Sequence, residues 1–369
     1  MDTNAWYALI APGLVFVLVI ELVLARWRGA RAYVLGDTLA NLSCGLGQVT
    51  LGVFTGAFFL GLYAEFASRF AIVRWEPDAV TPWVLAFLLT DLCYYLFHRA
   101  SHRVALFWAI HAVHHQSEEM NLSVALRQTW FSDFTAVFFF WPLPLLGIPR
   151  ESFFVAVAVL SSYEALQHTV LVRGGGLWGL IFNTPATHRL HHARDPIYRD
   201  RNYASTLVVW DRLFGTFVRE IHAPTYGTVE PFRSWSPLRA QFAPMRALAQ
   251  RLVRAPRLRD RLEILVRPPE WRAPGEAPSE GLVLAPRWSP GVPAPRVAAY
   301  ALVQSLLVLA GGLYAIAHAG EMSLAHFALC SLLIALACEV SATLLERSAN
   351  AQSGSARPDV ADADRACRT

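Results

Sequence analysis

Nine of the twelve histidines in this sequence lie between positions 98 and 192. They occur in three short motifs and one isolated position: HRASH at 98–102, HAVHH at 111–115, HRLHH at 188–192 and LQHT at 166–169. On a helix, side chains three and four residues apart share a face, so each motif directs its imidazoles to one side. Neutral imidazole is the commonest protein ligand of transition metals, and eight or nine exceed what one ion can hold. The pattern therefore predicts two metal ions.

The residue types leave the identity of the metal open. Affinity alone favours copper or zinc, whereas an all-nitrogen pair of high coordination with room for oxygen is compatible with iron. Zinc remains the alternative in purified protein. A zinc-dependent hydrolase is disfavoured, because the sequence has no HExxH motif and one catalytic zinc needs fewer histidines. The isolated His222, His318 and His326 are expected to be structural.

Three acidic residues near the histidines are candidates for catalysis. Glu118 and Glu119 follow the second motif by three and four residues, which keeps them near the histidine face if the helix continues. Asp91 precedes the first motif by seven residues, about two helical turns. We expect these carboxylates to accept hydrogen bonds from imidazole N–H groups or to act in catalysis, and Glu118 or Glu119 could also be an additional metal ligand. The alternatives are a solvated helix face for the two glutamates and a plain polar helix residue for Asp91. Asp211 and Arg212 are expected to form a structural ion pair.

The elements that must carry these residues are those of a membrane protein. Of 369 residues, 54% are hydrophobic and 16% are charged, with a mean hydropathy of +0.35, whereas soluble domains carry about 25% charged residues. A spanning helix needs about 20 mostly apolar residues. Segments of this kind lie at 6–25, 38–66, 82–97, 132–148, 151–170, 297–319 and 322–345. The sequence predicts an all-α polytopic membrane protein with the histidine site on a cytoplasmic cap.

The arginines set the expected orientation. The apolar run 8–24 is followed by Arg26, Arg28 and Arg31, the reverse of the charge order in a signal peptide, so we expect a retained helix whose C-terminal end faces the cytoplasm. Counting membrane crossings from this end then places residues 98–131 and 171–296 on the cytoplasmic side. The net charge of +4 comes without a nucleic-acid-binding motif, so nucleic acid is excluded as a partner. The five cysteines form no CxxC pair, and no disulfide framework is expected.

Five segments of the sequence resemble those of a known family. They are DLCYYLFHRASH at 91–102, LFWAIHAVHHQSEEMNLSVALRQ at 106–128, LQHT at 166–169, FNTPATHRLHHARD at 182–195 and RNYASTLVVWDRLFGTF at 201–217. The chain resembles the fatty acid hydroxylase and sterol desaturase superfamily of membrane di-iron enzymes, and most closely its alkylglycerol monooxygenase-like branch, which has bacterial relatives.

The resemblance implies an enzyme that binds two irons, activates O2 and hydroxylates a lipid C–H bond, with ether-lipid cleavage as the reaction of that branch. The implied iron ligands are His98, His102, His111, His114, His115, His168, His188, His191 and His192. Asn121 and Arg127 match the branch motif and are expected to contact a cofactor or a lipid head group. Two alternatives stay open: a sterol or fatty-acyl desaturase with the same di-iron site, and a metal-transport or metal-storage protein with histidines along a transmembrane path.

The same resemblance bears on partners and location. The substrate is expected to be a lipid that enters from the bilayer, and electrons come from tetrahydrobiopterin in one branch and from a reductase chain in others. The sequence does not choose the donor or indicate an oligomeric state. The location implied is a bacterial inner membrane, with the metal site on the cytoplasmic side.

The expected organisation has five parts. Residues 1–80 hold N-terminal transmembrane helices, and 81–220 form a hydroxylase/desaturase-type catalytic domain. A Pro- and Arg-rich connection, expected to be extended, occupies 221–296. A C-terminal helix pair follows at 297–345, and the polar tail at 346–369 is expected to be disordered.

Overall fold

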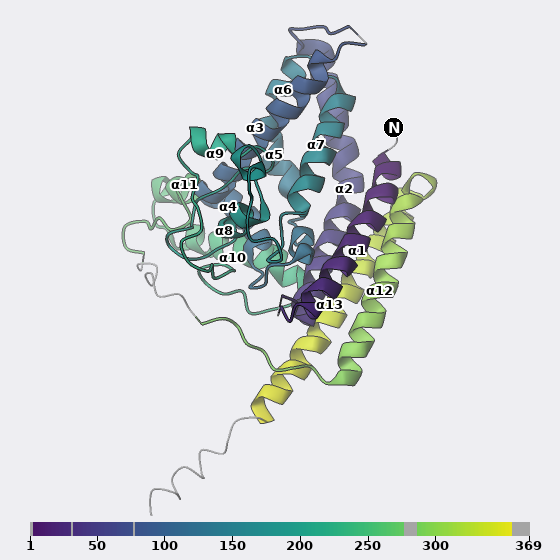
Figure 1. Ribbon diagram of the computed structural model, residues 1–369, viewed down its shortest axis with the longest axis vertical. Helices are drawn as coiled ribbons and strands as arrows, with labels where there is room; N and C mark the ends of the chain where they lie inside the picture. Colours follow the sequence, from purple (N-terminus) through teal and green to yellow (C-terminus); the bar gives the residue numbers. More distant parts are fainter. Residues whose placement is uncertain (1–2, 31, 77, 277–285, 356–369) are drawn as a thin grey trace, which may run out of the picture.

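A computed structural model of the chain describes residues 3–30, 32–76, 78–276 and 286–355. Within these ranges the structure is helical and has no strands, only the isolated bridges Phe182–Leu207 and Ala193–Tyr226. Long helices run side by side through the molecule, and a lobe of short helices and loops lies against one flank of this bundle (Figure 1). The predicted all-helical class is confirmed for the described residues.

The helices of the bundle, including the short α5 and α6, follow the apolar runs of the sequence, and several continue beyond them. Their bounds are α1 Thr3–Trp27, α2 Leu35–Phe70, α3 Thr81–Arg103, α5 Ser132–Phe140, α6 Pro142–Leu145, α7 Arg150–Ala165, α12 Pro295–Ala317 and α13 Leu324–Ser355. The chain breaks between α6 and α7 at Gly147, whose φ of 71° suits a residue without a side chain. The most consequential extension is that of α3, which the apolar run predicts to end at 97 and which continues to Arg103.

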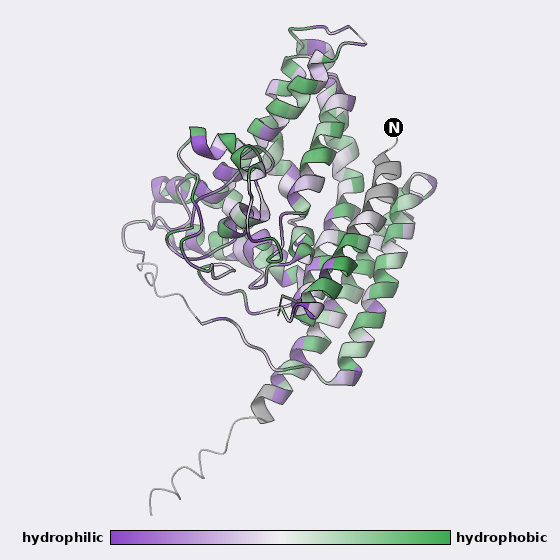
Figure 2. Cartoon of the chain, in the orientation of Figure 1, coloured by the Kyte–Doolittle hydropathy of each residue, from purple (hydrophilic) through white to green (hydrophobic). Residues whose placement is uncertain are grey.

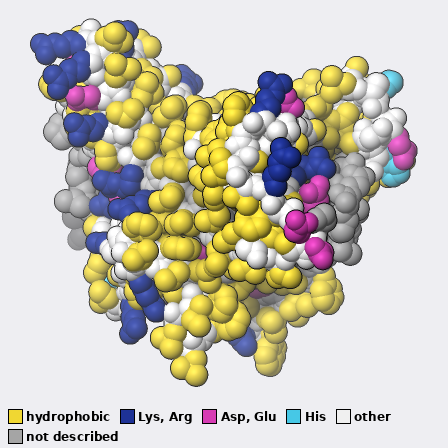
Figure 3. All heavy atoms as spheres, turned by 90° about the horizontal axis from the view of Figure 1, so that it is seen from above, with side chains coloured by type: hydrophobic (Ala, Val, Ile, Leu, Met, Phe, Trp, Pro, Cys, Tyr) yellow, Lys and Arg dark blue, Asp and Glu magenta, His cyan; other side chains and the backbone are white. Residues whose placement is uncertain are grey.

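Three described helices are long and apolar enough to cross a membrane: α2, α12, and α13 from Leu324 to Gln352. The predicted spans at 6–25, 82–97, 132–148 and 151–170 are not among these three. Hydrophobic residues extend along the long helices (Figure 2), and they cover much of the surface seen from above (Figure 3). These features are those of an integral membrane protein.

The lateral lobe consists of short helices and turns together with one longer helix, α10, of 18 residues. They are α4 Ala105–His111, η1 Ala112–His115, η2 Leu122–Leu126, η3 Trp178–Leu180, α8 Pro185–His191, α9 Val209–Leu213, α10 Pro237–Arg254 and α11 Leu258–Val266, while η4 Ala319–Glu321 joins α12 to α13. The expectation of an extended connection over 221–296 is wrong for α10 and α11. Helix α10 forms because Ser236 caps it, accepting a hydrogen bond from the Arg239 N–H, and because Pro237 suits its first turn.

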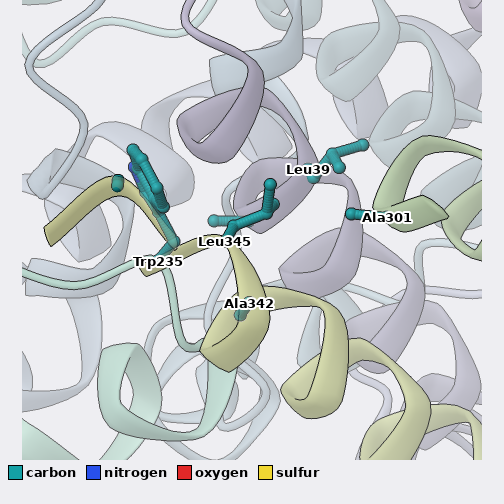
Figure 4. Close-up of a cluster of buried hydrophobic side chains, with 7 residues drawn as sticks. Leu39, Trp235, Ala301, Ala342 and Leu345 are labelled. Carbon is teal, nitrogen blue, oxygen red and sulfur yellow. The ribbon is translucent and has the colours of Figure 1, made fainter. Parts of the chain in front are cut away.

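A buried cluster around Trp235 joins the lobe to the long helices (Figure 4). The indole belongs to one cluster with Leu39 of α2, Ala301 of α12 and Leu345 of α13. The Glu346 carboxylate accepts hydrogen bonds from the backbone N–H of Trp235 and from the Ser234 hydroxyl. The tail predicted to be disordered from 346 therefore begins too early, because helix α13 continues to Ser355. Residues 356–369 lie outside the described residues.

Glycine 36 tests the importance of this junction. A Cβ on Gly36 would lie 2.2 Å from the Trp235 ring, whereas a Cβ on Gly56 of the same helix meets nothing within 4 Å. We expect Gly36→Ala to destabilise the protein by about 1–3 kcal/mol through overpacking, and Gly56→Ala to be neutral or slightly stabilising. Thermal unfolding in detergent measures both, and equal melting temperatures for the two variants would contradict this assignment.

Candidate metal centre

All nine histidines of the sequence motifs converge in the lobe, in two adjacent groups. The first group contains His98, His102, His111, His115 and His191, and the second contains His114, His168, His188 and His192. Within each group one ring nitrogen per residue lies within 4.8 Å of all the others. The groups adjoin, since the rings of His115 and His192 stack at 4.5 Å between centroids. All nine side chains are buried.

Local structure explains how the motifs converge. The extension of α3 places His98 and His102 one turn apart on the same face. Helix α8 begins at a capping box in which Thr184 and Thr187 satisfy each other's backbone N–H groups, with Pro185 in the first turn. This fixed start sets the register of the three histidines in HRLHH.

Backbone carbonyls orient four of the imidazoles. Nδ1 of His98 lies 2.8 Å from the Tyr203 carbonyl oxygen, and Nδ1 of His114 lies 3.1 Å from that of Arg127. Nδ1 of His168 lies 3.0 Å from the Glu164 carbonyl oxygen, and Nδ1 of His191 lies 3.0 Å from that of Arg201. A carbonyl only accepts hydrogen bonds, so each Nδ1 carries the proton and each Nε2 keeps its lone pair. Those lone pairs face the interior of the groups, as metal ligation requires.

The spacing and protonation of the nitrogens fit bound cations. Pairs of Nε2 atoms lie 3.0–3.3 Å apart, as in His98–His111 and His168–His188, and two nitrogens bound at about 2.0–2.1 Å to one ion are about 2.9–3.4 Å apart. Burial, with the nearby His114, lowers the pKa of His168 to about 3, and burial lowers that of His114 to about 4. The imidazoles are therefore neutral near pH 7 and available as ligands.

Two buried nitrogens without protein partners support the same fit. Nε2 of His102 and Nε2 of His191 point into the first group and make no hydrogen bond to any described residue. Unpaired buried polar atoms are uncommon in folded proteins. A metal ion in the first group would give both atoms a partner.

Asp91 does not contact a histidine. Its carboxylate accepts hydrogen bonds from the backbone N–H groups of Thr206 and Leu207, at 3.1 Å each, and from the indole of Trp210 at 2.8 Å. The predicted hydrogen bond from an imidazole is therefore wrong. Instead, Asp91 fastens the 206–210 segment to α3, because three donors converge on a buried carboxylate.

Asp211 fastens the preceding part of the same segment. It accepts hydrogen bonds from the N–H groups of Tyr203 and Ala204 at 2.9 Å, so it fixes the residue whose carbonyl orients His98. Arg212 donates instead to the carbonyls of Leu180 and Gly179. The predicted Asp211–Arg212 ion pair is therefore wrong.

The 200–203 turn aims two of the orienting carbonyls. Asp200 and Asn202 have backbone φ values of 57° and 54°. These values lie in the left-handed region, which residues other than glycine rarely adopt. The Asn202 side chain stabilises this geometry by accepting from Val218 N–H and donating to the Thr187 carbonyl. Backbone strain of this kind persists where the surroundings fix it, which here places the carbonyls of Arg201 and Tyr203.

Glu118 and Glu119 also lie away from the imidazoles. The helix containing the second motif ends as the 3-10 turn η1 at His115, so the expected continuing helix is absent from this region. Glu118 accepts the backbone N–H of Trp288 at 2.8 Å, and Glu119 pairs with Arg287 at 2.5 Å. The prediction that these carboxylates support the imidazoles is therefore wrong in its geometry.

Asn121 and Arg127 are structural in this fold. Asn121 is fully buried, caps η2 through the Ser123 N–H and donates to the Ala32 carbonyl. Arg127 is 1% exposed, and its guanidinium donates to Val113 O, Asn41 and Gln116. Since protein groups occupy these donors, the expected contact with a cofactor or head group does not match the structure. Arg127 acts on the centre through its carbonyl, which orients His114.

Comparisons with known proteins agree with this centre. Residues 83–216 match the family described as Fatty acid hydroxylase. Alkylglycerol monooxygenase of Xenopus tropicalis is 33% identical over 261 residues, which are 70% of this chain and 58% of that protein. Alkylglycerol monooxygenase of Homo sapiens is 32% identical over 267 residues, which are 72% of this chain and 59% of that protein. Ornithine lipid hydroxylase of Rhizobium tropici is 33% identical over 136 residues, which are 36% of this chain and 41% of that protein. The chain thus spans less than two thirds of these relatives, and no solved structure matches.

The two groups predict a metal stoichiometry. We expect the purified protein to hold about two transition-metal ions per chain when metal is supplied during expression. The double variant His168→Ala, His188→Ala leaves two histidines in the second group and is expected to hold about one. Elemental analysis by plasma mass spectrometry measures this, with the exposed His222→Ala as control; retention of two ions by the double variant would exclude the second group as a site.

Proposed function

The chain belongs to the fatty acid hydroxylase family through residues 83–216, and on this premise we propose that it is an O2-dependent lipid hydroxylase with one iron in each histidine group. Its relatives bear out the resemblance of the sequence to that superfamily. The observation that carries the proposal is the pair of buried, all-histidine groups whose lone pairs converge. Iron bound there would supply the oxidising chemistry with O2, which amino-acid side chains cannot provide.

The protein's own residues contribute orientation and exclusion of water. The four carbonyl contacts hold the imidazoles as neutral ligands. The rings of Tyr203 and Trp108 pack on His102 of the first group, with centroids 5.3 and 5.1 Å away. Such walls keep water from a reactive centre and so protect it from side reactions.

An apolar crevice beside the second group supports a lipid as substrate. Its lining comes from α1, η2 and the end of α7: Val17, Leu18, Leu122, Ala125, Leu126, Ala165 and Leu166. Leu126 directly precedes Arg127, whose carbonyl orients His114, and Leu166 lies two residues before His168. The crevice has a volume of only about 10 Å³, about the space of one water, so its side chains must separate before a hydrocarbon chain can lie there, close to the second group. We propose that the substrate enters there from the bilayer.

Hydroxylation is favoured over the alternatives. The monooxygenases match over 70% or more of the chain, whereas a sterol desaturase of Leptosphaeria maculans is 26% identical over 45% of it. A transporter or storage protein is disfavoured because the histidines form closed groups and do not line α2, α12 or α13. By similarity to the alkylglycerol monooxygenases we further propose an ether lipid as substrate. From the arginines that follow the first apolar run we propose a cytoplasmic-side centre, and from the resemblance of the sequence to bacterial relatives a bacterial inner membrane.

Lipid analysis with metal analysis tests the proposal. The protein is expressed with ample iron and purified, and membranes with and without it are given O2 together with either tetrahydrobiopterin or a reductase system. We expect iron in both groups and an O2-dependent oxidised lipid with one of the two donors. Full zinc occupancy, less than one iron per chain and no O2-dependent lipid change would exclude the oxygenase function.

One histidine from each group tests the division of the centre. We expect His191→Ala of the first group and His114→Ala of the second each to reduce the lipid change by at least about 100-fold, because removal of a ligand perturbs its metal. Both proteins should remain inserted in the membrane. The exposed His326→Ala is the control, and activity in either histidine variant comparable with that of the control would remove the residue from the proposed ligand set.

A further inference from the structure

Six large apolar side chains of the lobe are exposed on two neighbouring segments. Leu177 of the first segment is 84% exposed, and Leu213 of the second is 68% exposed. A single exposed leucine is ordinary on a protein surface, whereas a group of large apolar side chains on one surface marks a site of interaction. The six residues come from the loop around η3 and from the end of α9, and we call them the lobe patch: Leu177, Trp178, Leu180, Ile181, Leu213 and Phe214.

Hydrogen bonds hold the two segments of the lobe patch side by side. The Arg212 guanidinium of α9 donates to the carbonyls of Leu180, at 2.7 Å, and Gly179, at 3.2 Å. The Val208 N–H donates to the Ile181 carbonyl at 2.9 Å. The two segments therefore form one surface.

The inner side of the lobe patch is fastened to the long helices. The Trp178 indole donates to the Tyr163 hydroxyl of α7 at 2.8 Å, and its ring stacks on Phe182 with centroids 4.0 Å apart. The Trp210 indole of α9 donates to Asp91 of α3 at 2.8 Å. These contacts satisfy the indole N–H groups, while the described residues leave much of the apolar surface of the patch uncovered.

The apolar surface continues from the lobe patch along α7. Val159, Tyr163 and Leu166 lie on one face of that helix, four and three residues apart, and Val159 and Leu166 are exposed. Helix α7 runs beside α2, one of the three helices that can cross a membrane (Figure 1). Through the Trp178–Tyr163 contact, the lobe patch thus adjoins the part of the molecule that lies in lipid.

The exposed charges beside the lobe patch are positive. Arg173 and Arg219 are exposed, and neither forms an ion pair within 4.0 Å with a described carboxylate. Arg189 brings their segments together, because its guanidinium donates to the Arg173 carbonyl and pairs with Glu220. Tryptophan and apolar side chains beside arginines are typical of a bilayer interface, where anionic head groups meet acyl chains. A second copy on the same patch would add arginines of like charge, which disfavours self-association.

We propose that the lobe patch lies in the bilayer interface, with its apolar side chains among the acyl chains and Arg173 and Arg219 beside anionic head groups. The membrane then holds the lobe at a place separate from α2, α12 and α13. The loop around η3 lies in the membrane surface and not free on one side of it. This inference concerns the seat of the lobe and stands independently of the proposed reaction.

Photo-crosslinking from the lobe patch tests this placement. A benzophenone-bearing amino acid replaces Leu177 or Leu213 in the whole chain, which is reconstituted in vesicles of phosphatidylethanolamine and phosphatidylglycerol and irradiated. Leu258 of α11 is the matched control position, since it is 71% exposed and α11 lies at the edge of the lobe farthest from α12 (Figure 1). We expect mass spectrometry to find lipid adducts at 177 and 213 at least about tenfold more often than at 258, because side chains among acyl chains meet lipid continuously.

The contribution of the arginines has its own test. We expect the lipid adduct at 177 to fall roughly threefold or more in vesicles of phosphatidylcholine, and equally with Arg173→Gln and Arg219→Gln in the anionic vesicles, because arginines near an anionic surface are attracted to it. Arg254→Gln with Arg257→Gln, near position 258, is the control pair and should leave the adduct at 177 unchanged. Melting temperature and metal content of each protein report that the fold is retained.

The outcomes distinguish lipid from the other occupants. Crosslinks between two copies at 177 and 213 in place of lipid adducts, or lipid adducts no more frequent there than at 258, would overturn the placement in the bilayer. Equal adducts in anionic and zwitterionic vesicles would overturn the assignment of anionic head groups. Because crosslinking needs neither O2 nor an electron donor, lipid adducts without any oxidised lipid would refute the proposed function alone, and oxidised lipid without these adducts would refute this inference alone.

Discussion

The convergence of nine buried imidazoles is the constraint on which the rest of the lobe depends. Their burial keeps them neutral, as the lowered pKa values of His114 and His168 show. Neutral imidazoles whose lone pairs meet at 3.0–3.3 Å repel one another unless cations or protons lie between them. Such an arrangement persists only if the backbone holds each ring, and the four carbonyl contacts do so. The centre is thus a property of the loops as much as of the histidine motifs.

Those loops are held by buried carboxylates that do not touch the imidazoles. Asp91 reaches from α3 to the 206–210 segment, and Asp211 holds residues 203 and 204. Through Tyr203 this network orients His98, which itself lies on α3 two turns beyond Asp91. The helix therefore supplies both a histidine and the anchor of the loop that orients it. A change in either carboxylate should act on the centre through the backbone and not through direct contact.

The sequence predicts the histidines well and their supporting residues poorly, for physical reasons. The histidines four residues apart in each motif enter the same group, whereas His114 and His191, three residues after His111 and His188, enter the adjacent group. The close spacing within each motif therefore keeps all its imidazoles at the centre. The roles of Asp91, Glu118 and Arg127 depend on contacts between segments distant in the sequence, which spacing does not encode. Arg201 and Tyr203 orient imidazoles through their backbone carbonyls. Because every residue has a backbone carbonyl, the amino-acid types at these positions do not predict this role.

Anomalous diffraction from crystals of the iron-loaded protein tests the central claim most directly. Data collected on both sides of the iron absorption edge locate iron independently of any assay, substrate or electron donor. The account predicts two anomalous peaks, one among His98, His102, His111, His115 and His191 and the other among His114, His168, His188 and His192. A single peak shared by the nine histidines, or peaks only at the zinc edge, would contradict a centre of two irons.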